Sequence, residues 1–273
     1  CVKFTKNTLS PSFPQAKNGA ERVQKQQNPK RRLFWVLTER AESGIIQYIK
    51  NRGFAAFFGR NIMDNLVITV GREFGSGGRE FGRRLSDDLQ IAYYDREIIA
   101  EIAKRTSLSE EYVHQIVERK PYIPFPITTG RTFYPLTDPV IEQTLSVYNE
   151  QQNIIREMAE KSDCVIVGRC ADRILKDMHP LRIFVYSDMP SRLKRCREKA
   201  PEHEHMSDSA LKRHILKIDK ERAKYYSFYT GRKWGDRLNF DLCINTAHIT
   251  PKEAAAELAK VLITRRHTPV SED

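Results

Sequence analysis

A glycine-rich turn between an apolar run and a helical pattern is the part of this sequence best suited to chemistry. Residues 66–70 are mostly β-branched, residues 71–80 read Gly-Arg-Glu-Phe-Gly-Ser-Gly-Gly-Arg-Glu, and a helical pattern follows. Glycines let successive backbone N–H groups point inward, and the N-terminus of the following helix adds the positive end of its dipole. Such a turn is typical of a site for phosphate oxygens, although an ordinary tight connection from strand to helix would read similarly.

The turn departs from the consensus phosphate-binding loop, G-x-x-x-x-G-K-[ST]. Counted back from Gly77, Arg72 stands where the first glycine belongs, and Gly78 replaces the lysine. Arg79 offers a cation nearby, but arginine is a bulkier, forked group, and this one could equally be a solvated residue of the first helical turn. The residues that offer backbone N–H groups or charge to a phosphate are Gly75, Ser76, Gly77, Gly78 and Arg79.

The ligand of a magnesium ion is the least defined part of this loop. Glu80 occupies the place of the Ser or Thr that normally binds Mg²⁺. A carboxylate there could hold the metal, directly or through water, but it would also repel a triphosphate. The candidate metal ligands are Ser76 and Glu80.

The positive charge of the chain is concentrated at its N-terminal end. Residues 1–62 contain twelve Lys and Arg against three Asp and Glu, whereas the other 211 residues hold 34 basic and 32 acidic groups. The net charge of +11 is therefore weak support for nucleic-acid binding by the folded part, and we expect no specific nucleic-acid partner. We interpret residues 1–62 as a basic extension that is disordered or partly helical, residues 63–268 as one domain and residues 269–273 as a tail.

The five cysteines indicate neither a zinc site nor a disulfide framework, because they form no C-x-x-C pair and no metal-binding spacing with histidine. No apolar stretch approaches the roughly 18 to 20 residues needed to cross a bilayer. We therefore expect a protein of the reducing cytoplasm without a transmembrane segment. The sequence does not indicate the oligomeric state.

From residue 66 onward, short apolar runs alternate with helical patterns. We expect strands at residues 66–70, 91–94, 164–167, 182–186 and 241–244. We expect helices at residues 79–89, 96–104, 109–118, 138–161, 170–176, 190–198, 207–229 and 251–265. Because several strand runs are apolar throughout, the pattern predicts a three-layer α/β domain with a parallel sheet and ligands at the carboxyl ends of the strands.

Residues 120–135, rich in Pro, Tyr and Phe, form either an excursion over the substrate side or a rigid surface connection.

Several segments, in order, resemble the cytidylate kinase-like family. They are residues 68–80, 93–99, 165–171, 219–226, 230–236 and 242–246. The resemblance runs from about Met63 to the end of the last helix and does not cover residues 1–62. It implies a P-loop kinase fold with about five parallel strands and a helical lid. It also implies ATP as phosphoryl donor, Mg²⁺ as charge partner and a nucleoside monophosphate, CMP or dCMP, as acceptor.

The resemblance also suggests roles for single residues. Arg169 matches the arginine that contacts the acceptor monophosphate in cytidylate kinases. Asp95 and Arg96 stand where those enzymes form the acceptor pocket, although Asp95 could also cap the helix that follows. Asp219 and Arg222 match the D-x-x-R of the lid helix, with the aspartate near the acceptor sugar and the arginine near phosphates. A D-x-x-R on a helix is also a routine surface ion pair.

Residues 225–235 add two cations, Arg232 and Lys233, between glycines and aromatic rings. This stretch could close over ATP and bring either cation to the place of the missing lysine, or it could be an aromatic-anchored loop. The candidate catalytic residues are then Arg79, Arg169, Arg222 and Arg232. The candidate substrate-binding residues are Asp95, Arg96, Arg169, Asp219 and Arg222, and Lys233 joins the ATP-binding set.

Three functions are compatible with these residues. The first is ATP-dependent phosphoryl transfer to CMP or dCMP, which the set of arginines favours. The second is a nucleotide-binding sensor or scaffold without transfer chemistry, which Gly78 and Glu80 favour. The third is a kinase of a different small acceptor, because Cys170 replaces an aspartate of the cytidylate kinases.

Overall fold

Residues 65–118, 139–199 and 206–266 are described by the computed structural model. The basic extension 1–62, the proline-rich segment 120–135 and the tail 269–273 lie outside these residues, so the expectations for them stay predictions. The proposed domain boundaries also stay predictions.

The described residues form a five-stranded parallel sheet in the order β2-β3-β1-β4-β5. The strands are β1 (Val67–Arg72), β2 (Ala92–Tyr94), β3 (Cys164–Val167), β4 (Leu181–Tyr186) and β5 (Leu242–Asn245). The register pairs Val67 with Cys164 on one side of β1 and Ile68 with Leu181 on the other. Because β1 is the central strand, its loop opens at the middle of the carboxyl edge, where ligands bind in open α/β sheets. The predicted α/β fold with five parallel strands is confirmed.

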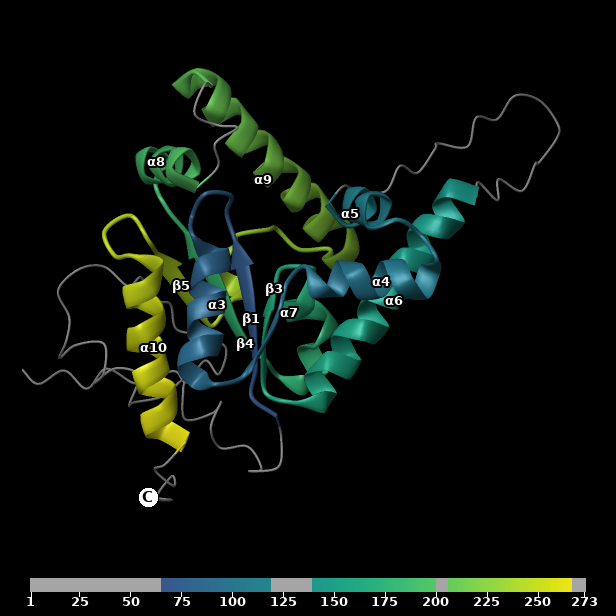
Figure 1. The fold of residues 1–273 in the computed structure, drawn as a ribbon, viewed down its shortest axis with the longest axis horizontal. Helices are drawn as coiled ribbons and strands as arrows, with labels where there is room; N and C mark the ends of the chain where they lie inside the picture. Colours follow the sequence, from purple (N-terminus) through teal and green to yellow (C-terminus); the bar gives the residue numbers. More distant parts are fainter. Residues whose placement is uncertain (1–64, 119–138, 200–205, 267–273) are drawn as a thin grey trace, which may run out of the picture. The chain divides into compact units, whose positions relative to one another are not determined.

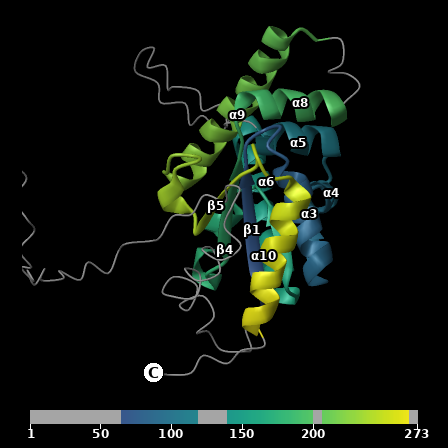
Figure 2. The same cartoon turned by 90° about the vertical axis from the view of Figure 1, so that its left-hand side faces the viewer.

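Helices cover both faces of the sheet (Figure 1). They are α3 (Gly78–Leu89), α4 (Glu97–Thr106), α5 (Glu110–Glu118), α6 (Pro139–Lys161), α7 (Ala171–Ile174), α8 (Met189–Lys199), α9 (Asp208–Thr230) and α10 (Pro251–Arg266), with 3-10 turns η1 (Lys176–Met178) and η3 (Arg237–Asn239). Figure 2 shows α10 in front of the strands, beside α3. Of the described helices, none is both long and apolar enough to cross a membrane.

The alternating side chains of β1 build the two halves of the core. Ile68 and Val70 are fully buried among residues of α3 and α10, whereas Val67 belongs to the opposite cluster with α4, α6 and α7. Burying side chains of this size stabilises the fold by roughly 1.5–3 kcal/mol each. A strand buried on both faces is therefore apolar throughout, as the sequence pattern indicated.

Most element bounds differ from the sequence prediction by one or two residues, and two of these differences bear on the site. β1 continues to Arg72 because its pairing with β4 continues, with Arg72 opposite Val185. The helix expected at residues 170–176 is split at Leu175 into α7 and the separate turn η1, and Cys170 precedes α7 in a left-handed conformation. The longer β1 matters for the site, since it makes Arg72 the last residue of the central strand.

Candidate active site

The glycine loop between β1 and α3 is a sharp turn that ends on the N-terminus of α3. Gly75 and Gly77 have φ values of 77° and 80°, a left-handed conformation that side chains disfavour. The Ser76 hydroxyl donates to the Glu73 carbonyl at 2.8 Å and accepts from the Gly78 N–H at 3.4 Å. Ser76 is fully buried, so its hydroxyl holds the turn together from inside.

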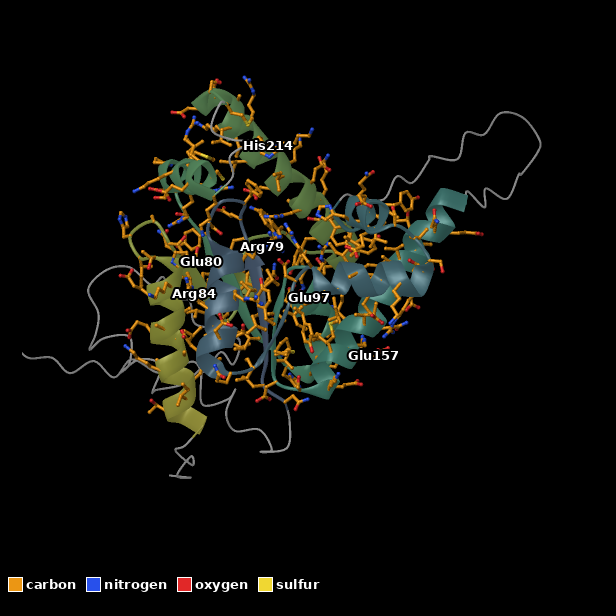
Figure 3. The ribbon with its side chains drawn as sticks, in the orientation of Figure 1. Arg79, Glu80, Arg84, Glu97, Glu157 and His214 are labelled. Atoms are coloured by element: carbon orange, nitrogen blue, oxygen red, sulfur yellow. The ribbon has the colours of Figure 1, made fainter. Side chains whose placement is uncertain are left out.

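An open groove of about 740 Å³ lies over this loop, and we call it the loop groove. A groove of this size can hold a nucleotide. Its lining combines the loop residues Gly75, Gly77, Gly78, Arg79 and Glu80 with Arg72, Asp95, Arg96, Arg195, Lys199 and Arg222. The structure therefore brings most of the residues predicted from the sequence to one place. Figure 3 shows Arg79 and Glu80 on α3 near the carboxyl edge of the sheet.

Asp95 lies at the end of β2 and pairs with two arginines. Its Oδ2 is 2.6 Å from Arg79 Nε, and its Oδ1 is 3.8 Å from Arg72 Nη2. The Asp95 residue is only 3% exposed, whereas the Arg79 side chain is 53% exposed. Asp95 does not cap the next helix, because the N-cap position of α4 is Arg96 and no side chain caps it. The carboxylate instead fixes two cations beside the loop.

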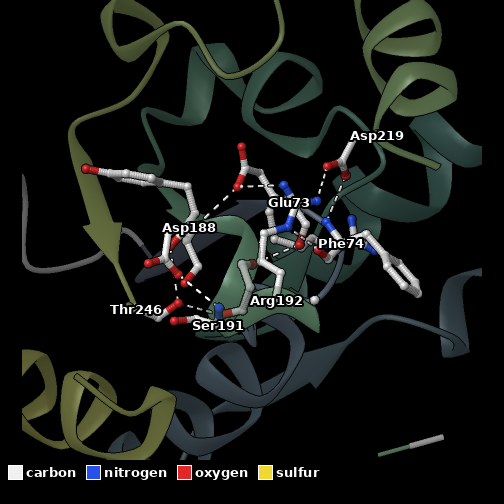
Figure 4. Close-up of polar contacts among 12 residues, drawn as sticks. Glu73, Phe74, Asp188, Ser191, Arg192, Asp219 and Thr246 are labelled. Atoms are coloured by element: carbon white, nitrogen blue, oxygen red, sulfur yellow. Dashed lines mark hydrogen bonds and ion pairs between the residues drawn. The ribbon is translucent and has the colours of Figure 1, made fainter. Parts of the chain in front are cut away.

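A second ion-pair network holds the loop from behind (Figure 4). Arg192 of α8 donates from Nε to the Phe74 carbonyl at 2.7 Å and pairs with Asp219 of α9 and with Glu73. Asp219 also accepts from the Phe74 N–H at 2.8 Å. Burial raises the pKa of Glu73, and the charge of Arg192 opposes that rise. Asp219 was expected near an acceptor sugar, but the structure places its carboxylate against the loop backbone, and it lines neither the loop groove nor the inner cavity defined below.

The segment after β5 supports the loop from a third side. Thr246 is fully buried, and its hydroxyl donates to the Ser76 carbonyl at 2.7 Å. The Arg195 guanidinium donates to the Thr246 carbonyl and lies 3.4 Å from the Gly75 carbonyl. Glu80 forms an ion pair with Lys199 of α8. The loop is therefore clamped by α8, α9 and the β5–α10 connection together.

Sequence reasoning missed Arg72, Arg192, Arg195 and Thr246 as parts of this site. Arg192 and Arg195 stand three residues apart on the helix after β4, so both face the same side of α8. That spacing, directly after a strand, is a signal that could have found them. Arg72 gave no such signal, because its sequence position is that of a glycine in the consensus loop.

A small, more enclosed space of about 50 Å³ lies next to the loop groove, and we call it the inner cavity. Its polar lining comprises Thr69, Arg72, Arg169, Asp172, Arg222, Tyr225 and Tyr226. Arg72 and Arg222 line both spaces. The guanidinium of Arg222 also stacks on Phe74, with 5.6 Å between its central carbon and the ring centroid.

The turn that presents Arg169 to the inner cavity is strained. Gly168, Arg169 and Cys170 have φ values of 76°, 58° and 55° in succession. A non-glycine residue in this conformation costs on the order of 1 kcal/mol, and such strain is concentrated at functional sites. The Arg169 carbonyl accepts from Gln151 Nε2 at 3.2 Å, which helps to hold the turn.

Buried polar groups surround the far side of the inner cavity. Tyr226 donates to the Asp172 carboxylate at 2.8 Å, and Tyr225 shares hydrogen bonds with Gln151. Burial raises the pKa of Asp172 and holds that of Cys170 well above its ordinary value. Cys170 is therefore a buried, uncharged thiol at physiological pH.

The two cations after α9 lie apart from the loop. Arg232 Nη1 donates to Asn239 Oδ1 at 3.3 Å, and the Lys233 carbonyl accepts from Asn239 Nδ2 at 2.9 Å. Neither residue lines the loop groove or the inner cavity as the structure describes them. Their predicted roles with ATP stay predictions.

The described residues contain no group of three or more metal-ligating side chains. A nucleotide-bound Mg²⁺ needs only one or two protein carboxylates, because phosphates and water fill the other positions. Glu80 lines the loop groove, while the Ser76 hydroxyl is turned into the protein. Glu80 is thus the better placed of the two predicted ligands.

A parallel α/β sheet with a glycine loop at the end of its central strand defines an open α/β protein, the class whose ligand sites lie at the carboxyl ends of the strands. More particularly, the chain belongs to the cytidylate kinase-like family, whose model matches residues 67–248. The family resemblance noted from the sequence is therefore confirmed.

A similar solved structure is that of an uncharacterized protein from Eubacterium ventriosum ATCC 27560, with 27% identity and a TM-score of 0.53 over 73% of this chain and 99% of that chain. Shikimate kinases from Acinetobacter baumannii and Bacteroides thetaiotaomicron are each 14% identical, with TM-scores of 0.42 and 0.43. They cover 76% and 72% of this chain and 97% and 98% of their own. A comparison with curated proteins finds no match.

Proposed function

We propose that this protein transfers a phosphoryl group from ATP to a nucleoside monophosphate, with CMP or dCMP as the first acceptors to test. The observation that carries the proposal is that Arg72 and Arg222 line both the loop groove and the inner cavity. A donor and an acceptor that share the loop groove, with the acceptor phosphate directed toward the inner cavity, would meet beside these two cations, because the inner cavity of about 50 Å³ is too small for a whole nucleotide. Membership of a kinase-like family supports the same chemistry.

Phosphoryl transfer depends on positioning and charge neutralisation rather than on a covalent intermediate. Donor phosphates would bind the Gly77 N–H and the N–H groups of the first turn of α3, where the helix dipole favours anions. Arg222, at the boundary of the two spaces, would neutralise the moving phosphoryl group. Arg169 would hold the acceptor phosphate from the inner cavity. Asp95 would orient Arg79, and Arg96 would contact the acceptor.

A bound Mg²⁺ would neutralise the charge of the donor phosphates, and we propose Glu80 as the protein group nearest to it. Glu80 already faces the loop groove but pairs with Lys199. Loading of the groove would therefore exchange that ion pair for a contact with the metal or its water shell.

A kinase of a different small acceptor is the second candidate. Cys170 is uncharged and buried among Tyr225 and Tyr226, so the position at which cytidylate kinases carry an aspartate offers no carboxylate here. Asp172 is nearby but already accepts from Tyr226. An acceptor other than a cytidine nucleotide would suit this lining. The nucleotide-binding sensor remains the outcome if ATP binds without turnover.

The test is ADP release by the full chain with ATP and Mg²⁺ across a panel of nucleoside monophosphates that includes CMP and dCMP. Turnover with a cytidine nucleotide is the expected result. Turnover with another acceptor would move the assignment to the second candidate. ATP binding without turnover on any acceptor, measured by calorimetry, would contradict the proposal. A cytoplasmic location and the absence of a specific nucleic-acid partner stay predictions.

A further inference from the structure

We propose that Arg72 supplies the phosphate-binding cation that the glycine loop lacks at position 78. This inference rests on the proposed binding of ATP phosphates in the loop groove. It assigns the role of the consensus lysine to a residue on the opposite side of the loop, at the end of β1.

Packing makes Arg72 and Gly78 mutually dependent. A Cβ atom built on Gly78 would overlap Arg72 Cβ and would lie 3.2 Å from both Arg72 Cγ and Val185 Cβ. A lysine at position 78 is therefore incompatible with the observed Arg72 side chain. The consensus loop has glycine at the position of Arg72 and lysine at the position of Gly78. In this chain the cation and the glycine have changed places, and the Arg72 side chain fills the space beside Gly78.

The Arg72 guanidinium lies where the ends of three strands meet. A Cβ atom built on Gly168, after β3, would overlap the Arg72 guanidinium, so the two are in contact. Its Nη2 is 3.8 Å from Asp95 Oδ1, after β2. The Arg72 side chain is 10% exposed and lines both the loop groove and the inner cavity. This is the position from which one cation can reach a phosphoryl group in either space.

The lining of the loop groove carries an excess of positive charge even though Asp95 is present, because seven Arg and Lys residues stand against Asp95, Glu73, Glu80 and Glu97. Asp95 carries one negative charge and pairs with two arginines, Arg72 and Arg79, so the three groups together are positive. Arg72 is the better candidate of the two, because it is nearly buried while the Arg79 side chain is 53% exposed. A charge near the protein interior interacts more strongly with a phosphate than a solvated one does. The guanidinium can also donate two parallel hydrogen bonds to phosphate oxygens.

Calorimetric titration with ATP and with inorganic tripolyphosphate, in the full chain, tests this role without requiring turnover. Arg72→Met keeps much of the volume and removes the charge, and we expect it to weaken tripolyphosphate binding at least tenfold. Arg84→Met is the matched control, because Arg84 is an exposed arginine of α3 outside the groove lining (Figure 3). We expect the control to bind within twofold of the wild type.

Variants that restore the consensus residues, glycine at position 72 and lysine at position 78, test the exchange of the two positions. Gly78→Lys alone should bind tripolyphosphate poorly, because its side chain and Arg72 need the same space. Arg72→Gly with Gly78→Lys should recover binding to within a few-fold of the wild type. Arg72→Gly with Gly78→Met is its uncharged match, and it keeps the test valid if Arg72→Met does not fold. Lysine and methionine variants that bind equally well would overturn the inference.

Failure of the proposed function and failure of the role of Arg72 give different experimental results. A wild-type protein that binds neither ATP nor tripolyphosphate contradicts the proposed function. A wild type that binds both, while Arg72→Met binds tripolyphosphate as tightly, leaves the function standing and overturns the role of Arg72. Equal losses in Arg72→Met and Arg84→Met would also overturn it, because the effect would then reflect overall charge.

Discussion

The carboxylate of Asp219 in α9 accepts a hydrogen bond from the backbone N–H of Phe74, 2.8 Å away in the glycine loop. The same carboxylate forms an ion pair with Arg192 of α8, whose Nε donates to the Phe74 carbonyl. Both backbone groups of Phe74 are thus held by one charged pair. This arrangement ties the conformation of the glycine loop to the packing of two helices.

Asp219→Asn should therefore destabilise the fold and weaken tripolyphosphate binding together. Removing one charge of a nearly buried pair costs about 3 kcal/mol, although Glu73 remains as a second partner for Arg192 and reduces that figure. We expect a loss of about 2 kcal/mol in the free energy of unfolding, measured with urea. The side chains of Arg192 and Asp219 are 5% and 12% exposed, so solvent screens the pair little.

Asp208→Asn is the control for this variant. Asp208 pairs with Arg197 between the same two helices, but its side chain is 78% exposed. An exposed pair contributes at most about 1 kcal/mol. Equal losses of stability in the two variants would show that the Asp219 pair has no special role in holding the loop.

Arg169→Ala should impair the use of the acceptor and leave the binding of ATP nearly unchanged. If Arg169 holds the acceptor phosphate, its removal should lower kcat/KM for the acceptor by roughly 100-fold and leave the KM for ATP within about threefold. Steady-state kinetics with each substrate varied in turn measures this split. Arg173→Ala, four residues away and outside the lining of the inner cavity, should change neither constant by more than about twofold. A rise in the KM for ATP in Arg169→Ala would instead place this arginine on the donor side.

Thr246→Val tests whether the β5–α10 connection supports the loop. Valine fills nearly the same volume but cannot donate to the Ser76 carbonyl, 2.7 Å from the Thr246 hydroxyl. A buried hydrogen bond of this kind contributes about 1 kcal/mol, and leaving its acceptor unsatisfied adds to the loss. Urea unfolding should show a decrease of about 1–2 kcal/mol. Thr264→Val, on an exposed part of α10, should remain within about 0.5 kcal/mol of the wild type.

The fold was largely predictable because the strand signal is local. Residues 164–167 are apolar at every position, and the structure buries all four between two layers of helices. The end of β1 was not predictable in this way. Arg72 joins the strand because β4 continues beside it, and that pairing connects residues more than a hundred positions apart.

The candidate site was predictable where a motif specifies backbone shape. The glycines of the loop follow from the sequence, because their conformational freedom lets successive N–H groups point to the edge of the sheet. Side-chain direction is different, since it depends on neighbours that are distant in the sequence. Arg72 reaches Asp95 only because Gly78 and Gly168 leave space, and Asp219 reaches Phe74 only because α9 crosses the loop.

Asp172 should make the stability of the wild-type protein fall with pH relative to Asp172→Asn. Burial raises the pKa of Asp172 above its ordinary value of 3.8, so the folded state binds this proton more tightly than the unfolded state does. The contribution of the protonated carboxyl to stability is therefore complete below about pH 3.8 and declines as pH rises through the raised pKa. Asparagine cannot ionise, so the unfolding free energy of the wild type minus that of the variant should decrease between pH 4 and pH 7, by no more than about 1.4 kcal/mol per pH unit. Urea unfolding at several pH values measures this difference. Asp177→Asn, at an exposed aspartate on η1, is the control for losing a surface charge.

A difference that increases with pH would contradict this prediction. It would mean that attraction by Arg182 and Arg232, together with the hydrogen bond from Tyr226, outweighs the cost of burial and keeps Asp172 ionised in the inner cavity.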